Sequence, residues 1–319
     1  MIRVAYLLIL LLALPPMVSA ADQPPKPATP AVRVGASSVE LEADDSMVVG
    51  GSIMPGFLKG QEGKLRAIAT VIEKPGSGKV AIVACDVLML NRDLLDPVAE
   101  EIGEALGIPP ANVLVNCTHT HHAPSTVTVH GYARDEIFCR RVQKAIVKAA
   151  KEANEKLKTG DATFHFRLGE ESSVGQNSRI LLKDNSIFWI GPRDDFVRPT
   201  GPFDPELPVL AFRGADGKPK AVLFNHSTHT IGVRKPGGRS PSFYGLATQE
   251  LEDELGGTFL FLEGASGSTH NLTLPASEMT LRIKQAVKDA LEKTTARPVQ
   301  KVAAIKKEFK FRIRQFDEA

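Results

Sequence analysis

Three of the eight histidines stand together in the segment 118–124, which reads Thr-His-Thr-His-His-Ala-Pro. It follows the apolar, β-branched stretch 112–116, which is typical of a strand. Neutral imidazole is a common zinc ligand, and a catalytic zinc site gathers at least three protein ligands and keeps one position open for water. His119, His121 and His122 therefore indicate a metal site, although such a run also occurs in polar loops without a metal.

Four polar side chains each follow an apolar run, at the point where a predicted strand ends. They are Asp86, His119, His226 and Glu263. Ligands bind outside the carboxyl ends of parallel strands, so these side chains converge on one crevice if the four strands are parallel. Antiparallel strands would separate them. Local capping or turn formation is the alternative explanation for the two carboxylates.

Strand-like and helix-like segments alternate along the chain, as judged from the spacing of apolar residues. The pattern predicts an α/β fold in which helices cover a mixed, partly parallel central sheet. The expected helices are 92–106, 135–157 and 275–291, and the expected strands are 79–85, 112–116, 162–168, 186–190, 208–212, 221–224, 258–262 and a basic alternating strand at 305–314.

The first 20 residues have the pattern of a cleavable signal peptide. Arg3 supplies a positive charge, Val4–Leu14 is apolar, and Val18-Ser19-Ala20 ends in small residues. We expect a secreted or periplasmic protein that begins at Ala21, a proline-rich linker over 21–30, and one domain over 31–319. No later segment approaches the roughly 20 apolar residues that a membrane-spanning helix needs.

Charge and cysteine content bear on possible partners and on disulfides. The formal net charge is +2 and the basic residues are scattered, so no basic patch indicates a nucleic-acid partner. The three cysteines, Cys85, Cys117 and Cys139, have no CxxC spacing and predict no disulfide framework. The oligomeric state is left open by these features.

Several motifs occur in an order that is similar to the N-terminal catalytic domain of the neutral/alkaline, non-lysosomal ceramidases. Segment 118–124 resembles that family's THTHSGP, and 224–228, Phe-Asn-His-Ser-Thr, resembles its segment ending in HST. Segment 240–247 resembles its SPxxxGYA motif, and 54–57, Met-Pro-Gly-Phe, resembles its MxGY turn. The resemblance extends over residues 33–315.

The resemblance implies a zinc-dependent amidase that hydrolyses the N-acyl bond of ceramide-like lipids or of another N-acyl amide, in peripheral contact with a membrane. It implies that His119 and His226 bind Zn²⁺ and that His121 is a neighbouring active-site histidine. Zinc activates water and polarises the amide carbonyl, and a histidine protonates the leaving amine.

Further site residues are implied by the same resemblance. Asn177 and Arg179 correspond to an NR-containing segment of the family, with the arginine displaced by one position. Segment 264–271 corresponds to a loop of the form NxGxxSPN, in which Thr269 takes the place of an active-site serine and His270 that of the proline. Ser266 and Ser268 are alternatives for the role of that serine.

In the resembled family two further zinc ligands, a glutamate and a tyrosine, come from sequence beyond the equivalent of Ala319. We therefore expect a catalytic domain that is incomplete at its C-terminal side and a poor enzyme, unless Asp86, Glu263, His121 or His229 completes the ligand set. Two alternatives remain: an amidohydrolase-type enzyme that uses the His119-Thr-His121 pair, and a catalytically inactive ceramidase-like binding domain.

Overall fold

Nine strands form the main sheet in the computed structural model, which describes residues 32–312 apart from 192, 272 and 311, and eight of them follow one another in a single hydrogen-bonded path. The order is β12-β11-β10-β5-β1-β2-β3-β4, and β14 pairs with β5. The bounds are β1 Val32–Glu40, β2 Arg66–Lys74, β3 Gly78–Cys85, β4 Val113–Cys117, β5 Asp161–Glu170, β10 Glu206–Arg213, β11 Pro219–His226, β12 Thr258–Glu263 and β14 Thr295–Ala296. The predicted signal peptide and the whole of the predicted linker lie outside the described residues.

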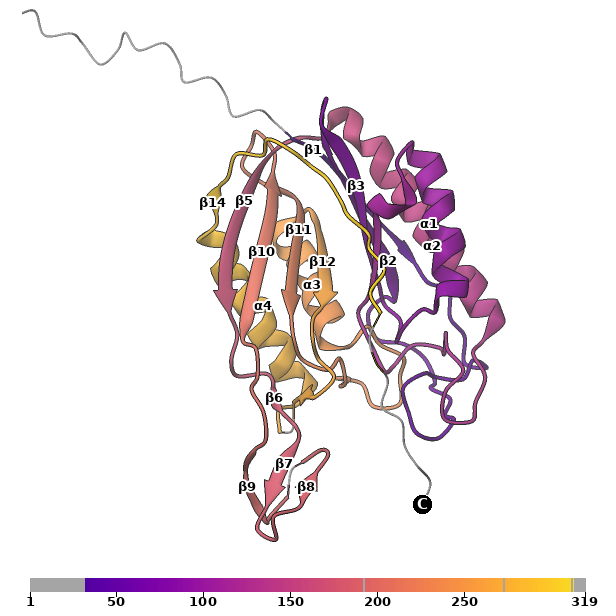
Figure 1. Ribbon diagram of the computed structural model, residues 1–319, viewed down its shortest axis with the longest axis vertical. Helices are drawn as coiled ribbons and strands as arrows, with labels where there is room; N and C mark the ends of the chain where they lie inside the picture. The colour runs from indigo at the N-terminus through magenta and orange to yellow at the C-terminus, as the bar shows by residue number, and fades with distance from the viewer. Residues whose placement is uncertain (1–31, 192, 272, 311, 313–319) are drawn as a thin grey trace, which may run out of the picture.

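This path folds into two sheet layers that face each other, and helices cover both outer faces (Figure 1). The helices α1 (Arg92–Leu106) and α2 (Glu136–Glu155) pack on β1 to β4, whereas α3 (Ser242–Leu255) and α4 (Ala276–Glu292) pack on β5, β10 and β12. Buried apolar residues from both sheets, among them Ile68, Leu223 and Leu260, fill the space between the layers. The predicted α/β fold with a mixed, partly parallel sheet is confirmed.

The predicted helices form where the apolar spacing placed them. The side chain of Asp135 caps α2 by accepting a hydrogen bond from the backbone N–H of Phe138 at 2.7 Å. Helix α2 then lies very close to β1, because a Cβ at Gly35 would come within 1.9 Å of the carbonyl oxygen of Ala153. Two short 3₁₀ turns, Pro110–Asn112 and Lys156–Thr159, connect these helices to the strands that follow.

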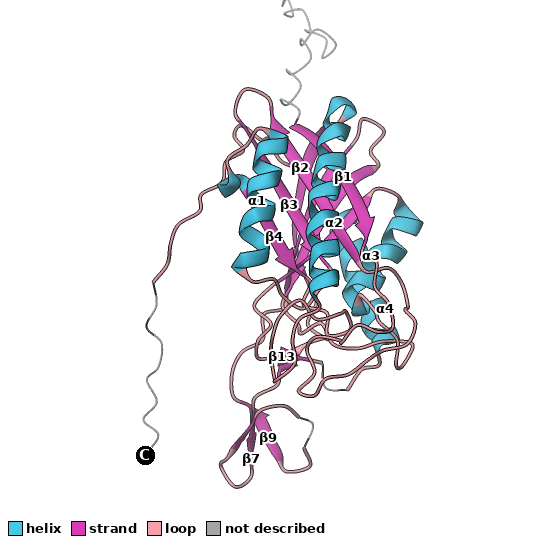
Figure 2. Ribbon diagram, turned by 90° about the vertical axis from the view of Figure 1, so that its right-hand side faces the viewer, coloured by secondary structure: helices cyan, strands magenta, loops and turns pink. Residues whose placement is uncertain are grey.

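The carboxyl ends of β4 and β12 meet although these strands close opposite ends of the path. The amide of Asn116 donates to the carbonyl of Glu263 at 3.1 Å and accepts from the N–H of Glu263 at 2.8 Å. Only two pairs of strands in this path are parallel, β3 with β4 and β11 with β12. The expected convergence of strand ends therefore arises because the sheet folds over, and the loops gather at one end (Figure 2).

Two smaller sheets lie at that end. One pairs β6 (Gln176–Asn177) with β13 (Thr269–His270), and the other contains β7 (Ile180–Leu182), β8 (Ile187–Phe188) and β9 (Phe196–Pro199). The second sheet projects from the body (Figure 1). Among the described helices, none is both long and apolar enough to cross a membrane.

The prediction of a strand over 305–314 is wrong for the residues that the structure describes in this range, because none of them belongs to a strand. Alternation stabilises a strand only when one face is buried. Ile305, one of the apolar residues of the alternating pattern, is 81% exposed and so is not packed against a sheet. The segment just before 305 contacts the β2–β3 hairpin, where the N–H of Val302 donates to the hydroxyl of Ser77.

Candidate metal centre

Three imidazoles converge at the end of the molecule where the loops gather. The Nε2 atom of His119 lies 3.1 Å from Nε2 of His229 and 3.4 Å from Nε2 of His121. Their potential ligand atoms all lie within 4.8 Å of one another. We call these three residues the imidazole triad.

Each ring of the triad is held by a hydrogen bond from its other nitrogen to a backbone carbonyl. Nδ1 of His119 lies 2.9 Å from the oxygen of Leu88, Nδ1 of His121 lies 2.9 Å from that of Gly51, and Nδ1 of His229 lies 3.2 Å from that of Ser266. A carbonyl oxygen only accepts, so each Nδ1 carries the proton and each Nε2 of a neutral ring presents a lone pair. Metal-binding histidines are typically oriented in this way.

Burial favours the neutral form of two rings of the triad, those of His121 and His229. Burial, together with the neighbouring His229 and His119, lowers the pKa of His121 to about 3. Burial also lowers the pKa of His229, against the opposing effect of its hydrogen bond to Ser266. Three lone pairs that face one another at this distance repel, and a shared cation removes that repulsion. The donor set fits a zinc ion, which prefers imidazole nitrogen and needs three protein ligands in a catalytic site.

The backbone is adapted to this arrangement at two positions. His119 has φ 61°, in the left-handed region that residues other than glycine rarely adopt. Strained backbone of this kind concentrates at functional sites. Gly51 has φ 98°, and a Cβ there would come within 2.5 Å of Nδ1 of His121. Glycine at this position therefore permits the carbonyl that holds His121 to approach the ring.

His226, the second zinc ligand implied by the resemblance, lies outside the triad. Its side chain is fully buried at the end of β11. Nε2 lies 2.9 Å from the carbonyl oxygen of Glu171 and must donate to it, so Nδ1 accepts from the hydroxyl of Tyr244 at 2.5 Å. Both ring nitrogens thus have protein partners. The structure does not bring His226 together with His119, and the neighbouring His229 supplies the third imidazole instead.

The two carboxylates at strand ends each contact a residue next to a triad histidine, Asp86 from a buried position and Glu263 from a half-buried one. Asp86 accepts hydrogen bonds from the N–H of Arg66 at 2.9 Å and the hydroxyl of Thr118 at 3.1 Å, and burial raises its pKa to about 6. The ring of His119 is held by the carbonyl of Leu88 and not by Asp86. Asp86 instead holds the residue that precedes His119.

Glu263 is the other carboxylate, at the end of β12. One carboxylate oxygen accepts from the hydroxyl of Thr230 at 3.0 Å, whereas Oε1 is buried without a hydrogen-bond partner. Burial raises the pKa of Glu263 to about 8. The carbonyl of Thr230 accepts from the N–H of His121 at 3.3 Å. Glu263 is therefore connected to the triad through Thr230.

Thr269 and Asn177 pair with each other across the β6–β13 sheet, beside the triad. The hydroxyl of Thr269 donates to the carbonyl of Ser227 at 2.6 Å, so its hydrogen is already used. Asn177 donates to the carbonyl of Pro202 and accepts from the N–H of Arg179. The contacts of these two side chains hold loops in place.

Arg179 and His270 lie at the same small sheet. The guanidinium of Arg179 donates to the carbonyl of Gly267 at 3.2 Å and to the hydroxyl of Ser178. The ring of His270 stacks on His229 with 4.1 Å between ring centroids and 17° between ring planes. Sequence reasoning had given His270 no functional role. Its position in the loop 264–271, which the sequence analysis matched to an active-site loop, could have indicated that it lies near the site.

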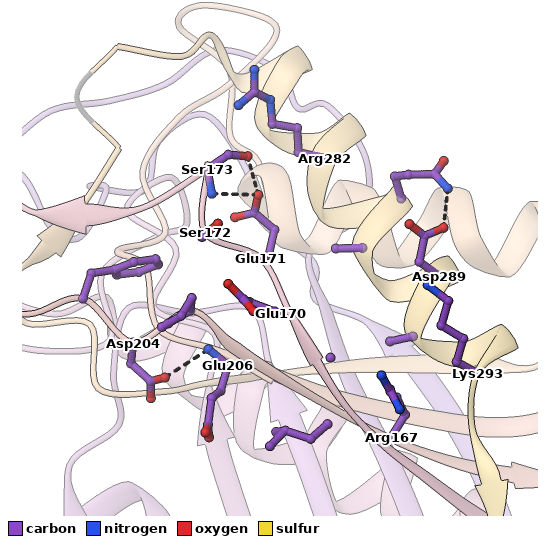
Figure 3. Close-up of a pocket in the computed structure, with 17 residues that line it drawn as sticks. Arg167, Glu170, Glu171, Ser172, Ser173, Asp204, Glu206, Arg282, Asp289 and Lys293 are labelled. Atoms are coloured by element: carbon purple, nitrogen blue, oxygen red, sulfur yellow. Dashed lines mark hydrogen bonds between the residues drawn. The ribbon is translucent and has the colours of Figure 1, made fainter.

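A large open cavity lies elsewhere, between β5, β10 and α4 (Figure 3). It measures about 1060 Å³, and its lining includes charged side chains of both signs, among them Arg167, Glu170, Glu206 and Asp289. None of the triad lines it. Two of its lining residues contact His226: the carbonyl of Glu171 holds the ring, and the ring of Phe203 lies edge-on to it.

No protein-family model and no curated protein matches the sequence. Among solved structures, the neutral ceramidase of Pseudomonas aeruginosa matches with a TM-score of 0.68 and 20% identity over 82% of this chain and 45% of that chain. A structure described as a ceramidase complexed with C2 matches with a TM-score of 0.63 and 19% identity over 82% of this chain and 44% of that chain. The chain spans less than half the length of these neighbours. It has the fold of the matching part of the neutral ceramidases.

Proposed function

We propose that this chain is a zinc-dependent amide hydrolase that acts on N-acyl sphingosines or closely related N-acyl amides. One observation carries the proposal: three Nε2 atoms converge while each Nδ1 is anchored to a carbonyl. The fold shared with neutral ceramidases supports the amide substrate. The two-layer sheet disagrees with the barrel that an amidohydrolase-type enzyme would need, so that alternative is not retained.

In this proposal His119, His121 and His229 hold the metal. A zinc ion bound there would supply Lewis acidity toward an amide carbonyl and would activate water. The carbonyls of Leu88, Gly51 and Ser266 hold the three rings in the metal-binding tautomer. His121 thereby changes from the proton-transfer role that the resemblance implied to a ligand role.

The loop 264–271 contacts His229 through Ser266, and a second loop contacts His121 through Gly51. The second loop carries Ile53, Met54 and Phe57, which are 64%, 69% and 63% exposed. Exposed apolar side chains beside a site are typical of surfaces that contact lipid or protein. They support a substrate that is taken from a lipid surface, and export after Ala20 would bring the protein to such a surface.

Two histidines with the same unusual backbone provide a matched test. His119 and His130 both have positive φ, 61° and 49°, but only His119 belongs to the triad. Asparagine tolerates this conformation, so neither substitution adds backbone strain. We expect His119→Asn to lower zinc stoichiometry and to abolish hydrolysis of N-acetylsphingosine, and His130→Asn to change neither. Equal zinc content in the two variants, measured by elemental analysis after dialysis, would contradict the proposal.

A further inference from the structure

A buried tyrosine contacts the loop that supplies one of the three carbonyls of the triad. Tyr132 lies in the segment between the histidine-rich loop and α2, and its side chain is buried. Its backbone N–H and carbonyl pair with those of Val129 at 3.1 Å each, and the two residues between them, His130 and Gly131, have positive φ. This tight turn fixes the place from which the ring of Tyr132 reaches the loop that contains Gly51.

The hydroxyl of Tyr132 holds two neighbouring peptide groups at once. It accepts a hydrogen bond from the N–H of Gly51 at 3.0 Å and donates one to the carbonyl of Ser52 at 2.9 Å. These roles are fixed, because an N–H only donates and a carbonyl only accepts. The carbonyl of Gly51, which lies 2.9 Å from Nδ1 of His121, belongs to the peptide group between these two. The hydroxyl therefore holds that peptide group from both sides.

Glycine at position 51 permits this geometry without enforcing it. The φ of 98° is open to glycine, and the lack of a Cβ leaves room for the ring of His121. The same freedom would let the carbonyl of Gly51 turn away from the ring. The N–H of Gly50 donates to the carbonyl of Ala123 at 3.0 Å and fixes the chain just before this point. The hydroxyl of Tyr132 fixes it at and after this point.

We infer that the hydroxyl of Tyr132 is a positioning group of the metal centre. It fixes the carbonyl of Gly51 and, through this carbonyl, the direction in which Nε2 of His121 points. This inference rests on the proposed function. Partners outside the ligands are typically worth 10 to 100-fold in metal affinity. Tyr132 acts through a backbone carbonyl, so we expect the lower end of this range, about a tenfold loss of zinc affinity when the hydroxyl is removed.

Tyr244 provides a matched control. It is also buried, and its hydroxyl lies 2.5 Å from Nδ1 of His226, a histidine outside the triad. Tyr132→Phe and Tyr244→Phe each remove one oxygen from a buried hydrogen bond, so both should lower the free energy of unfolding of the metal-free protein. In chelator competition, Tyr132→Phe should weaken zinc binding by about tenfold, whereas Tyr244→Phe should leave it unchanged.

A spectroscopic measurement separates a displaced ligand from a loss of stability. Co²⁺ in place of zinc has visible absorption bands that depend on the ligand geometry. These bands should change in Tyr132→Phe and stay as in wild type in Tyr244→Phe. In a Gly51→Ala background, where the ring is already displaced, Tyr132→Phe should weaken zinc binding by much less than it does in wild type. Unchanged zinc affinity in Tyr132→Phe overturns the inference, as do equal losses in the two tyrosine variants, which would indicate a purely structural hydroxyl.

If wild type binds neither zinc nor Co²⁺, the proposed function fails, and the inference is decided on the metal-free protein by NMR. The proton on Nδ1 of His121 should exchange with water slowly in wild type and in Tyr244→Phe. It should exchange faster in Tyr132→Phe, because its hydrogen bond to the carbonyl of Gly51 opens more often. Equal exchange rates in wild type and Tyr132→Phe overturn the inference.

Discussion

His226 and His229 lie three residues apart at the end of β11, yet their environments are opposite. The ring of His226 is fully buried and both of its nitrogens have protein partners, the carbonyl of Glu171 and the hydroxyl of Tyr244. The ring of His229 is anchored only through Nδ1, and its Nε2 faces two other imidazoles. A histidine can bind a metal when one nitrogen is fixed and the other is left without a protein partner. Position at a strand end does not decide this.

The strongest test of this difference is an alanine substitution at each histidine, read out in two ways. We expect His229→Ala to lower zinc affinity by at least about 100-fold, because a direct ligand is lost and outer contacts alone are worth 10 to 100-fold. Its free energy of unfolding without metal should change little. Chelator competition and urea unfolding measure the two quantities.

The same substitution at His226 should have the reverse effect. His226→Ala leaves the hydroxyl of Tyr244 and the carbonyl of Glu171 buried without their partner, and it leaves a cavity. We expect a loss of about 2 to 4 kcal/mol in the free energy of unfolding. Zinc affinity of the folded fraction should be retained. If His226→Ala abolishes zinc binding in a protein that still unfolds cooperatively, the assignment of His229 is wrong.

The anchoring of the rings can be tested at Gly51. A Cβ at this position would come within 2.5 Å of Nδ1 of His121, and the residue has positive φ. We expect Gly51→Ala to lower zinc affinity by about 10 to 100-fold through displacement of His121. Gly60 also has positive φ, but a Cβ there would meet no atom within 4 Å, so Gly60→Ala carries similar backbone strain without the contact. Equal zinc affinities in the two variants would rule out this role for the carbonyl of Gly51.

The buried carboxyl of Glu263 predicts a dependence of stability on pH in the metal-free protein. Its pKa is raised from 4.5 to about 8, so the folded state binds more protons than the unfolded state between these values. Stability contributed by this group therefore falls as pH rises from 4.5 to 8. We expect Glu263→Gln to be more stable than wild type at pH 9 by more than about 1 kcal/mol, and the difference to shrink toward pH 5. A difference that does not vary with pH, in urea unfolding with chelator present, would contradict this.

The smallest effect concerns the exposed apolar side chains beside the site. Replacing Phe57 by Ser should lower the fraction of protein bound to phosphatidylcholine vesicles by a few-fold, since a single large apolar side chain contributes about 1.5 to 3 kcal/mol at most when fully buried. Leu281→Ser on α4 is the control, since Leu281 is also exposed, at 53%. Co-sedimentation measures both. If the two variants bind vesicles equally, the loop that carries Phe57 is not the contact surface.

The local pattern of the sequence was sufficient for much of the fold. Apolar spacing predicted α1 at its observed bounds, and α2 and α4 within two residues at each end, because amphipathic periodicity is set by neighbours along the chain. It did not predict α3, whose residues are buried on most sides and show only a weak period. The prediction of a strand at 305–314 was wrong for the described residues, because alternating apolar residues form a strand only where one face packs against the rest of the protein.

For the site, the sequence by itself identified the histidine-rich loop that follows β4 and the strand ends that lie near it. The tertiary structure decided that His229, and not His226, joins His119 and His121. That choice depends on the carbonyls of Leu88, Gly51 and Ser266. Each of them is distant in sequence from the ring that it holds. It also depends on the sheet folding into two layers, which brings the ends of β4 and β12 together. Such contacts are fixed by packing over long sequence separations, so no local pattern records them.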